Sequence, residues 1–247
     1  MAVKNDGKIV LAFDIYGTLL DTGSITKSLI EKLPELDENK ANQLSQLWRR
    51  YQLEYTWRLN SMELYESFDV ITKRSLFHAA AELKVPVDEL TAGKILEDYN
   101  RLSPFEDAHP TLQALSKNDN VKCVIFSNGT REMVLSAINA SPLSQVISDI
   151  YVADSIRRYK PSPVLYNGLV QYLSTTAEDA AISYAPKDVW LVSGNPFDVT
   201  GARAAGLQAI WVDRLETGWL DEISAELKPT KIVHNLGQIT EFVAEGM

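Results

Sequence analysis

The residue of this sequence best placed to do chemistry is Asp14, an aspartate at the end of a short apolar run. It follows "KIVLAF" in the stretch "AFDIYGTLLD", with Tyr16 two residues further on and Gly17-Thr18 next. An aspartate carboxylate can act as a nucleophile that forms a covalent intermediate with its substrate. The chemistry therefore depends on which other side chains the fold brings beside Asp14.

Polar side chains also follow three other apolar runs. They are Ser127, Asn128 and Gly129 after "VKCVIF", Lys160 after the shorter "DIYVAD", and Ser193, Asn195 and Asp198 after "VWLV". Open parallel sheets bind their ligands beyond the carboxyl ends of the strands. Each position alone also fits an ordinary turn, because Ser, Asn, Gly and Asp are common turn residues. Together with Asp14, these groups predict one ligand site at one edge of a sheet.

The elements that would position these residues alternate between strand-like and helix-like patterns. Continuous apolar runs, typical of strands buried on both faces, occupy residues 8–13, 121–126, 189–192 and 208–212. Segments of helical period lie between or beside the later runs, at residues 130–140, 162–173 and 198–206. This alternation predicts an α/β fold with a doubly wound, mostly parallel sheet.

The interval from residue 22 to residue 102 breaks this alternation. It has no strand-like run, and its apolar residues recur at spacings of three and four, as in Leu44, Leu47, Trp48 and Tyr51. We expect four helices there, at residues 24–33, 40–60, 64–83 and 87–102. The chain would then have an α/β core domain, residues 1–20 and 103–247, and an inserted helical cap domain, residues 21–102. The two domains would meet above Asp14.

Composition and charge exclude several classes of function. The chain has 24 basic and 33 acidic side chains, and its net charge of −9 argues against general affinity for nucleic acid or an anionic membrane. Its start, "MAVKNDGKIVLAF", has the pattern of neither a signal peptide nor a membrane span. The single cysteine, Cys123, forms no intrachain disulfide, which fits a cytoplasmic protein, and we expect it to be a packing residue. The histidines, His78, His109 and His234, show no metal-site spacing.

The ordered set of Asp14, Ser127, Lys160 and Asp198 resembles the haloacid dehalogenase superfamily, and the resemblance covers almost the whole chain. Within the superfamily the sequence is most similar to the L-2-haloacid dehalogenases of type II, on the stretches "FDIYGTLLD", "LWRRYQLEYTW", "FSNGT", "YKPSPVLY" and "SGNPFDVTGA". The second stretch is the most diagnostic, because the fold alone does not require it. The resemblance implies a Rossmann-like core with a helical cap, and a homodimer formed through that cap.

Two positions separate this sequence from the phosphatases of the superfamily. Tyr16 stands where those enzymes carry a second aspartate that protonates the leaving alkoxide, and Asn195 stands where an acidic residue commonly occurs. A halide leaving group is a weak base and needs no such acid. A magnesium site needs several oxygen ligands, whereas Lys160 would supply a permanent positive charge beside Asp14 and Asp198. We therefore expect a dehalogenase that uses neither a metal nor another cofactor.

The reaction implied by the resemblance has two stages. Asp14 attacks C2 of a short L-2-haloacid and displaces halide, and water then attacks the aspartyl carbonyl of the ester, which releases a D-2-hydroxy acid. The residues implied to orient Asp14 and to complete its hydrogen-bond network are Thr18, Lys160, Tyr166, Ser193 and Asn195. Asp198 would hold Lys160 and help to activate the water.

The resemblance also assigns residues to the parts of the substrate. Its carboxylate would bind to Ser127 and to the backbone N–H groups of Ile15 and Tyr16. The residues implied to receive the departing halide are Arg49, Asn128 and Phe197, and those implied to surround the alkyl group are Tyr16, Leu53 and Phe68.

Alternatives stay open at this point. Tyr16 also fits a packed aromatic, Arg49 an exposed helix arginine and Tyr166 a core residue, while the neighbouring Arg50 is expected on the helix surface. The alternative functions are a phosphatase or phosphotransferase of the same superfamily, and a hydrolase of another small carboxylate with an electrophilic carbon, such as a strained nitrogen-bearing ring. A protein that binds a small carboxylate without turning it over is the remaining alternative.

Overall fold

The computed structural model describes residues 7–147, 149–177 and 182–246, so the first six residues of the N-terminal stretch lie outside the described part. Within these residues one six-stranded sheet has the order β3-β2-β1-β4-β5-β6, and every neighbouring pair is parallel. The strands are β1 Ile9–Phe13, β2 Val121–Ser127, β3 Ile150–Val152, β4 Val189–Ser193, β5 Gln208–Val212 and β6 Lys231–Val233. The predicted α/β fold with a parallel sheet is confirmed.

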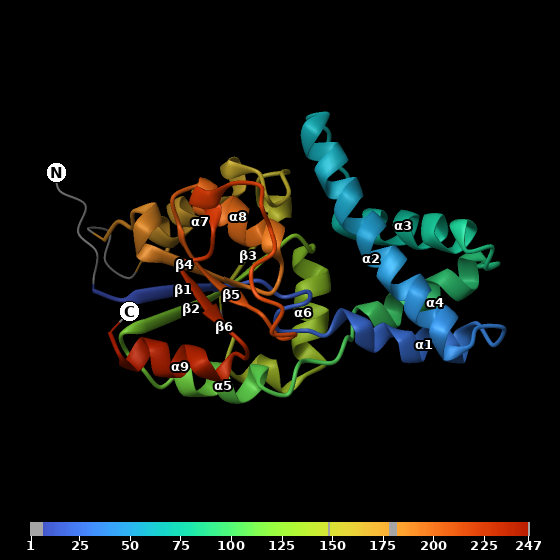
Figure 1. Ribbon diagram of the computed structural model, residues 1–247, viewed down its shortest axis with the longest axis horizontal. Helices are drawn as coiled ribbons and strands as arrows, with labels where there is room; N and C mark the ends of the chain where they lie inside the picture. Colours follow the sequence, from blue (N-terminus) through green and yellow to red (C-terminus); the bar gives the residue numbers. More distant parts are fainter. Residues whose placement is uncertain (1–6, 148, 178–181, 247) are drawn as a thin grey trace.

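Helices cover both faces of this sheet (Figure 1). α7 and α8 lie on one side, and α5 and α9 lie side by side on the other. The helix bounds are α5 Ala108–Leu115, α6 Arg131–Asn139, α7 Pro163–Thr175, α8 Pro196–Ala204 and α9 Gly237–Ala244. Short 3-10 helices occur at Thr22–Ser24, Pro142–Gln145, Ala153–Ser155, Pro186–Asp188 and Ala225–Leu227.

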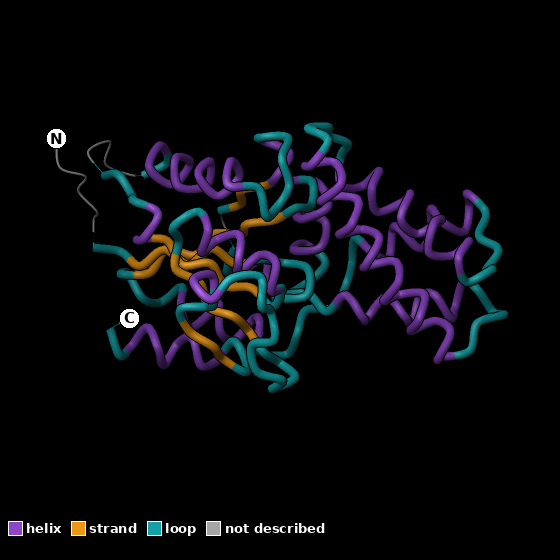
Figure 2. The backbone as a smooth tube through the Cα atoms, turned by 45° about the horizontal axis from the view of Figure 1, so that its top comes forward, coloured by secondary structure: helices purple, strands orange, loops and turns teal. Residues whose placement is uncertain are grey.

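The segment between β1 and α5 is helical and projects from one end of the sheet (Figures 1 and 2). Its α-helices are α1 Ile25–Lys32, α2 Glu38–Ser61, α3 Phe68–Glu82 and α4 Glu89–Tyr99, which confirms the four-helix prediction. α2 begins after Asp37, whose side chain accepts a hydrogen bond from the backbone N–H of Lys40 and so caps the helix. The indole of Trp48 donates to the backbone oxygen of Thr72 at 2.8 Å, which fixes α2 against α3. The domain boundaries at residues 21 and 102 stay a prediction.

The register of the three central strands brings the candidate residues to one edge. Val10, Leu11, Ala12 and Phe13 of β1 are completely buried, as a strand covered on both faces requires. Phe13 is level with Ile125 of β2 and with Val192 of β4. The residues that follow these positions therefore meet at the carboxyl edge of the sheet, which faces the helical segment (Figure 1).

Neither β6 nor α9 was predicted from the sequence. β6 is three residues long, and Lys231 and Ile232 are exposed, so this edge strand has no continuous apolar run. α9 lies near the C-terminal end and buries Ile239 and Val243 against the core. Within the described ranges, none of the helices combines the length and the apolar character that a membrane span requires.

Candidate active site

Asp14 lies directly after β1 and is 6% exposed. Its Oδ2 accepts hydrogen bonds from Thr18 Oγ1 at 2.7 Å and from Asn195 Nδ2 at 2.8 Å, and its Oδ1 accepts one from Lys160 Nζ at 3.1 Å. Thr18 Oγ1 in turn accepts a hydrogen bond from the backbone N–H of Gly194 at 2.9 Å. The carboxylate is therefore held in one orientation by donors from three separate segments of the chain.

Lys160 is buried, and each hydrogen of its ammonium group has an acceptor. Nζ donates to Asp14 Oδ1, to the backbone oxygen of Phe126 at 2.8 Å and to Asp198 Oδ2 at 2.7 Å. These three acceptors match the three hydrogens of the ammonium group. The backbone N–H of Lys160 donates to Asn128 Oδ1 at 2.8 Å. The oxygen of the Asn128 side-chain amide therefore faces the lysine. A positive charge is thus fixed between two carboxylates.

Asp198 is completely buried and bonds to Tyr166 as well as to Lys160. Tyr166 donates its phenolic O–H to Asp198 Oδ1 at 2.7 Å, and burial raises the pKa of Tyr166 well above its usual value. Burial also raises the pKa of Asp198; the charge of Lys160 opposes this increase, and the nearby carboxylate of Asp14 adds to it. Tyr166 therefore joins the network through Asp198 and does not itself bond to Asp14.

Several hydrogen-bond donors lie around Asp14 without a protein acceptor. In the described chain the backbone N–H groups of Ile15 and Tyr16 donate to no protein atom. Ser127 is completely buried, and its Oγ accepts from the backbone N–H of Gly129 at 2.9 Å, which leaves its hydroxyl hydrogen to be donated. Ser193 makes the equivalent hydrogen bond: its Oγ accepts from the backbone N–H of Asn195 at 3.2 Å. The unused donors can bind a small anion.

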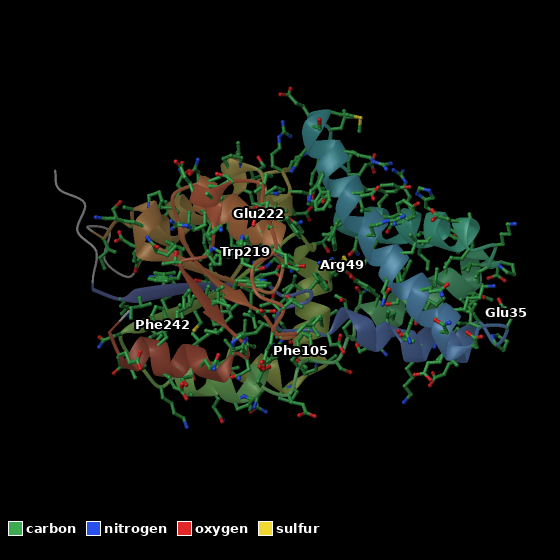
Figure 3. The ribbon with its side chains drawn as sticks, viewed as in Figure 1. Glu35, Arg49, Phe105, Trp219, Glu222 and Phe242 are labelled. Carbon is green, nitrogen blue, oxygen red and sulfur yellow. The ribbon has the colours of Figure 1, made fainter. Side chains whose placement is uncertain are left out.

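Arg49 reaches this site from α2 (Figure 3). Its Nη2 donates to the backbone oxygen of Tyr16 at 3.2 Å, and the same oxygen accepts from Asn195 Nδ2 at 3.0 Å. Arg50 behaves as expected for a surface residue: its side chain is 57% exposed and lies 3.5 Å from Glu54 and 3.8 Å from Glu82. The first arginine therefore belongs to the site and the second does not.

Aromatic rings cover the other side of the site. The ring centroid of Tyr16 lies 5.9 Å from that of Phe68 and 5.7 Å from that of Tyr99. The hydroxyl of Tyr16 is buried and, within the described residues, has no hydrogen-bond partner. Leu53 is partly buried on α2, and Phe197 packs against Trp57 with a centroid distance of 5.4 Å. Tyr16 and Phe68 are thus together, while Phe197 lies at the contact between α2 and α8.

The carboxylates do not fit a magnesium site. Each of the four oxygens of Asp14 and Asp198 already accepts a hydrogen bond from a side-chain donor. The position between the two carboxylates, where a cation would lie, holds the ammonium group of Lys160. In the part of the chain that is described, no cluster of three or more His, Cys, Asp or Glu side chains is arranged to hold a metal ion.

Comparison with known proteins identifies the family. A family model for haloacid dehalogenase-like hydrolases matches residues 10–206, which is most of the chain. The chain belongs to this family. The hydrolase is 32% identical over 204 residues to haloacetate dehalogenase H-2 of Moraxella sp. (strain B), with 83% of this chain and 85% of that protein covered. It is 30% identical over 236 residues to (S)-2-haloacid dehalogenase H-109 of Pseudomonas putida, with 95% and 97% covered.

Solved structures agree with these sequence relatives. The L-2-haloacid dehalogenase from Xanthobacter autotrophicus with chloropropionic acid covalently bound superposes on the hydrolase with a TM-score of 0.82 and 26% sequence identity, and 97% of this chain and 99% of that chain are covered. The predicted resemblance to the L-2-haloacid dehalogenases, the core with its helical cap and the expectation of an enzyme are confirmed.

Three residues near the site were not identified from the sequence. Gln52 bonds to Arg49, Tyr99 stacks on Tyr16, and Asn60 bonds to the residue before Lys160. The sequence offered one signal for Gln52. It is a polar residue between Trp48 and Tyr55, on the buried face of a helix.

Proposed function

We propose that this hydrolase converts short L-2-haloacids to D-2-hydroxy acids through a covalent ester on Asp14, without a metal. The observation that carries the proposal is the ammonium group of Lys160 fixed 3.1 Å from Asp14 Oδ1 and 2.7 Å from Asp198 Oδ2. A positive charge beside a carboxylate favours the charged form, which is the nucleophilic one. The proposed substrate class rests on relatives that are named as haloacetate and (S)-2-haloacid dehalogenases.

In the first stage, the substrate carboxylate binds to Ser127 and to the free N–H groups of Ile15 and Tyr16. This places C2 against Asp14, and an approach of about 3–3.5 Å supplies several kcal/mol of the barrier reduction. Asp14 Oδ1 accepts only one hydrogen bond, whereas Oδ2 accepts two, so Oδ1 keeps a lone pair for the attack. The C2–oxygen bond forms as the carbon–halogen bond breaks, with inversion at C2.

The departing halide is received by Arg49, with the amide N–H of Asn128 and the ring of Phe197 beside it. The acceptor oxygen of Asn128 is occupied by the backbone of Lys160, so its amide nitrogen faces the other way. Tyr16, Leu53 and Phe68 surround the alkyl group. No general acid is needed, because halide leaves as a weak base.

In the second stage, water attacks the aspartyl carbonyl carbon and the bond between that carbon and the ester oxygen breaks. One proton of the water passes to the departing alkoxide oxygen and the other to solvent, which restores the carboxylate and leaves the inverted C2 untouched. Asp198 helps to activate this water while it holds Lys160. An L-substrate therefore gives a D-product. A homodimer and a cytoplasmic location are part of the same proposal, by likeness to the family.

The experiment that tests the proposal is halide release from L-2-chloropropionate in excess chelator. Release should persist, and the D-enantiomer should be almost inert. Phosphate esters with added magnesium should release no phosphate above background. Magnesium-dependent phosphate release without halide release would instead identify a phosphatase or phosphotransferase. If neither halide nor phosphate is released, a ring-opening hydrolase or a protein that only binds carboxylates would be favoured.

A further inference from the structure

We propose that Gln52 is a positioning residue that holds Arg49 over the site without neutralising its charge. Gln52 follows Arg49 by three residues on α2, so the two side chains lie on the same face of the helix. Arg49 Nη1 donates to Gln52 Oε1 at 2.6 Å. The inference rests on the proposed function in one respect, which is that Arg49 receives the departing halide.

The hydrogen bonds around Gln52 fix the orientation of its amide. Gln52 is completely buried, and its Nε2 donates to Thr72 Oγ1 at 2.7 Å. Thr72 has one hydroxyl hydrogen, and it is donated to the backbone oxygen of Phe68 at 2.6 Å. Thr72 can therefore only accept from Gln52, so the nitrogen side of the amide faces Thr72 and the oxygen side faces Arg49.

Tyr99 completes the arrangement. Its phenolic O–H donates to the same Gln52 Oε1 at 3.1 Å, and its ring lies 5.7 Å from that of Tyr16. The amide of Gln52 thus has both its oxygen and its nitrogen bonded within the helical segment. Because hydrogen bonds hold both ends of the buried amide, the guanidinium of Arg49 is held in place before substrate arrives.

Both acceptors that the structure gives for Arg49 are neutral. They are Gln52 Oε1 and the backbone oxygen of Tyr16, and in the described residues no carboxylate lies within 4 Å of this guanidinium. The contrast with Arg50 is direct, because that neighbour is paired with Glu54 and Glu82. A guanidinium paired with a carboxylate has its charge cancelled locally, whereas one held by carbonyl oxygens keeps it for an incoming anion. Gln52 therefore fixes the position of the Arg49 guanidinium and leaves its positive charge unpaired.

The test compares Gln52→Glu with Gln52→Met. Glutamate has the same shape and can accept from both Arg49 and Tyr99, but it brings a negative charge that pairs with Arg49. Methionine removes the hydrogen bonds and leaves the charge of Arg49 unpaired. Bromide affinity, measured by isothermal titration calorimetry, should fall about tenfold or more in the glutamate variant and less in the methionine variant. The turnover number for L-2-chloropropionate should fall in the same order, by roughly 100-fold or more for glutamate.

A purely structural role for Gln52 predicts the opposite order, because glutamate can still accept from Arg49 and Tyr99, whereas methionine loses these bonds as well as the one to Thr72. A larger loss of bromide affinity in the methionine variant than in the glutamate variant would overturn the inference. So would unchanged bromide binding in the glutamate variant, or a wild-type protein that binds no bromide. Thermal unfolding of both variants checks that each is folded. Bromide binding needs no turnover, so failure of the wild-type protein to release halide would contradict the proposed function while the binding data still test Gln52.

Discussion

Asn60 of α2 and Tyr159, the residue before Lys160, exchange two hydrogen bonds. Asn60 Nδ2 donates to the backbone oxygen of Tyr159 at 2.7 Å, and the backbone N–H of Tyr159 donates to Asn60 Oδ1 at 2.9 Å. The next backbone N–H, that of Lys160, donates to Asn128 Oδ1. The backbone that carries the lysine is therefore held from the helical segment on one side and from the end of β2 on the other.

This relationship predicts that Asn60→Ala lowers the turnover number about tenfold or more, because small displacements in a site that positions its reactants are costly. It should also lower the free energy of unfolding by ~1–3 kcal/mol, since a partly buried backbone donor and acceptor lose their partner. Ser61→Ala, at the exposed next position, is the matched control and should leave both unchanged. Steady-state kinetics and urea unfolding measure the two effects. Normal turnover in Asn60→Ala would mean that the α2 contact does not position Lys160.

Arg49 should be essential and Arg50 should not. Arg49→Ala is expected to lower turnover by roughly 100-fold or more while the fold persists, because it removes the charge that receives the halide in a site shielded from water. Arg49→Lys should restore little, since a fork of donors becomes a point charge. Arg50→Ala is the control, because its ion pairs are exposed. Near-normal turnover of the Arg49→Ala variant would mean that Arg49 does not receive the halide.

The packed rings of Tyr16 and Phe68 predict a limit on substrate size. Tyr16 and Phe68 are 2% and 1% exposed, with their rings 5.9 Å apart, so they leave little room for a long alkyl chain. Two- and three-carbon L-2-haloacids should therefore have a higher kcat/KM than longer ones. A series of L-2-chloroacids of increasing length measures this, and a kcat/KM that rises steadily with length contradicts the assignment.

Cys123 should be unreactive in the folded protein. Burial raises the pKa of its thiol to about 12, so very little of it is in the reactive thiolate form at pH 8. Reaction with a disulfide reagent such as DTNB should be slow at pH 8 and should become about tenfold faster for each pH unit up to pH 10, because only the thiolate reacts. Unfolding in denaturant should make the reaction of Cys123 with DTNB fast. Rapid reaction of the native protein at pH 8 would show that the thiol is exposed.

Much of the fold was predictable because its signals are local. β5, Gln208–Val212, coincides with its apolar run, and Asp14 is found directly after β1. β6 was missed because an edge strand with two exposed residues carries no such signal. The roles of Gln52 and Asn60 depend on how α2 approaches α3 and the Tyr159 backbone, and spacing along the chain does not encode that approach.

The central claim is that Asp14 forms an ester with the substrate, and single-turnover hydrolysis in heavy-oxygen water tests it most directly. With enzyme in excess over L-2-chloropropionate, water attacks the aspartyl carbonyl, so the label should enter the Asp14 carboxylate and the first hydroxy acid should carry ordinary oxygen. Mass spectrometry of the peptide that contains Asp14 and of the product measures both. Label found in the hydroxy acid and absent from Asp14 would mean that water attacks C2 directly, and the covalent mechanism would be wrong.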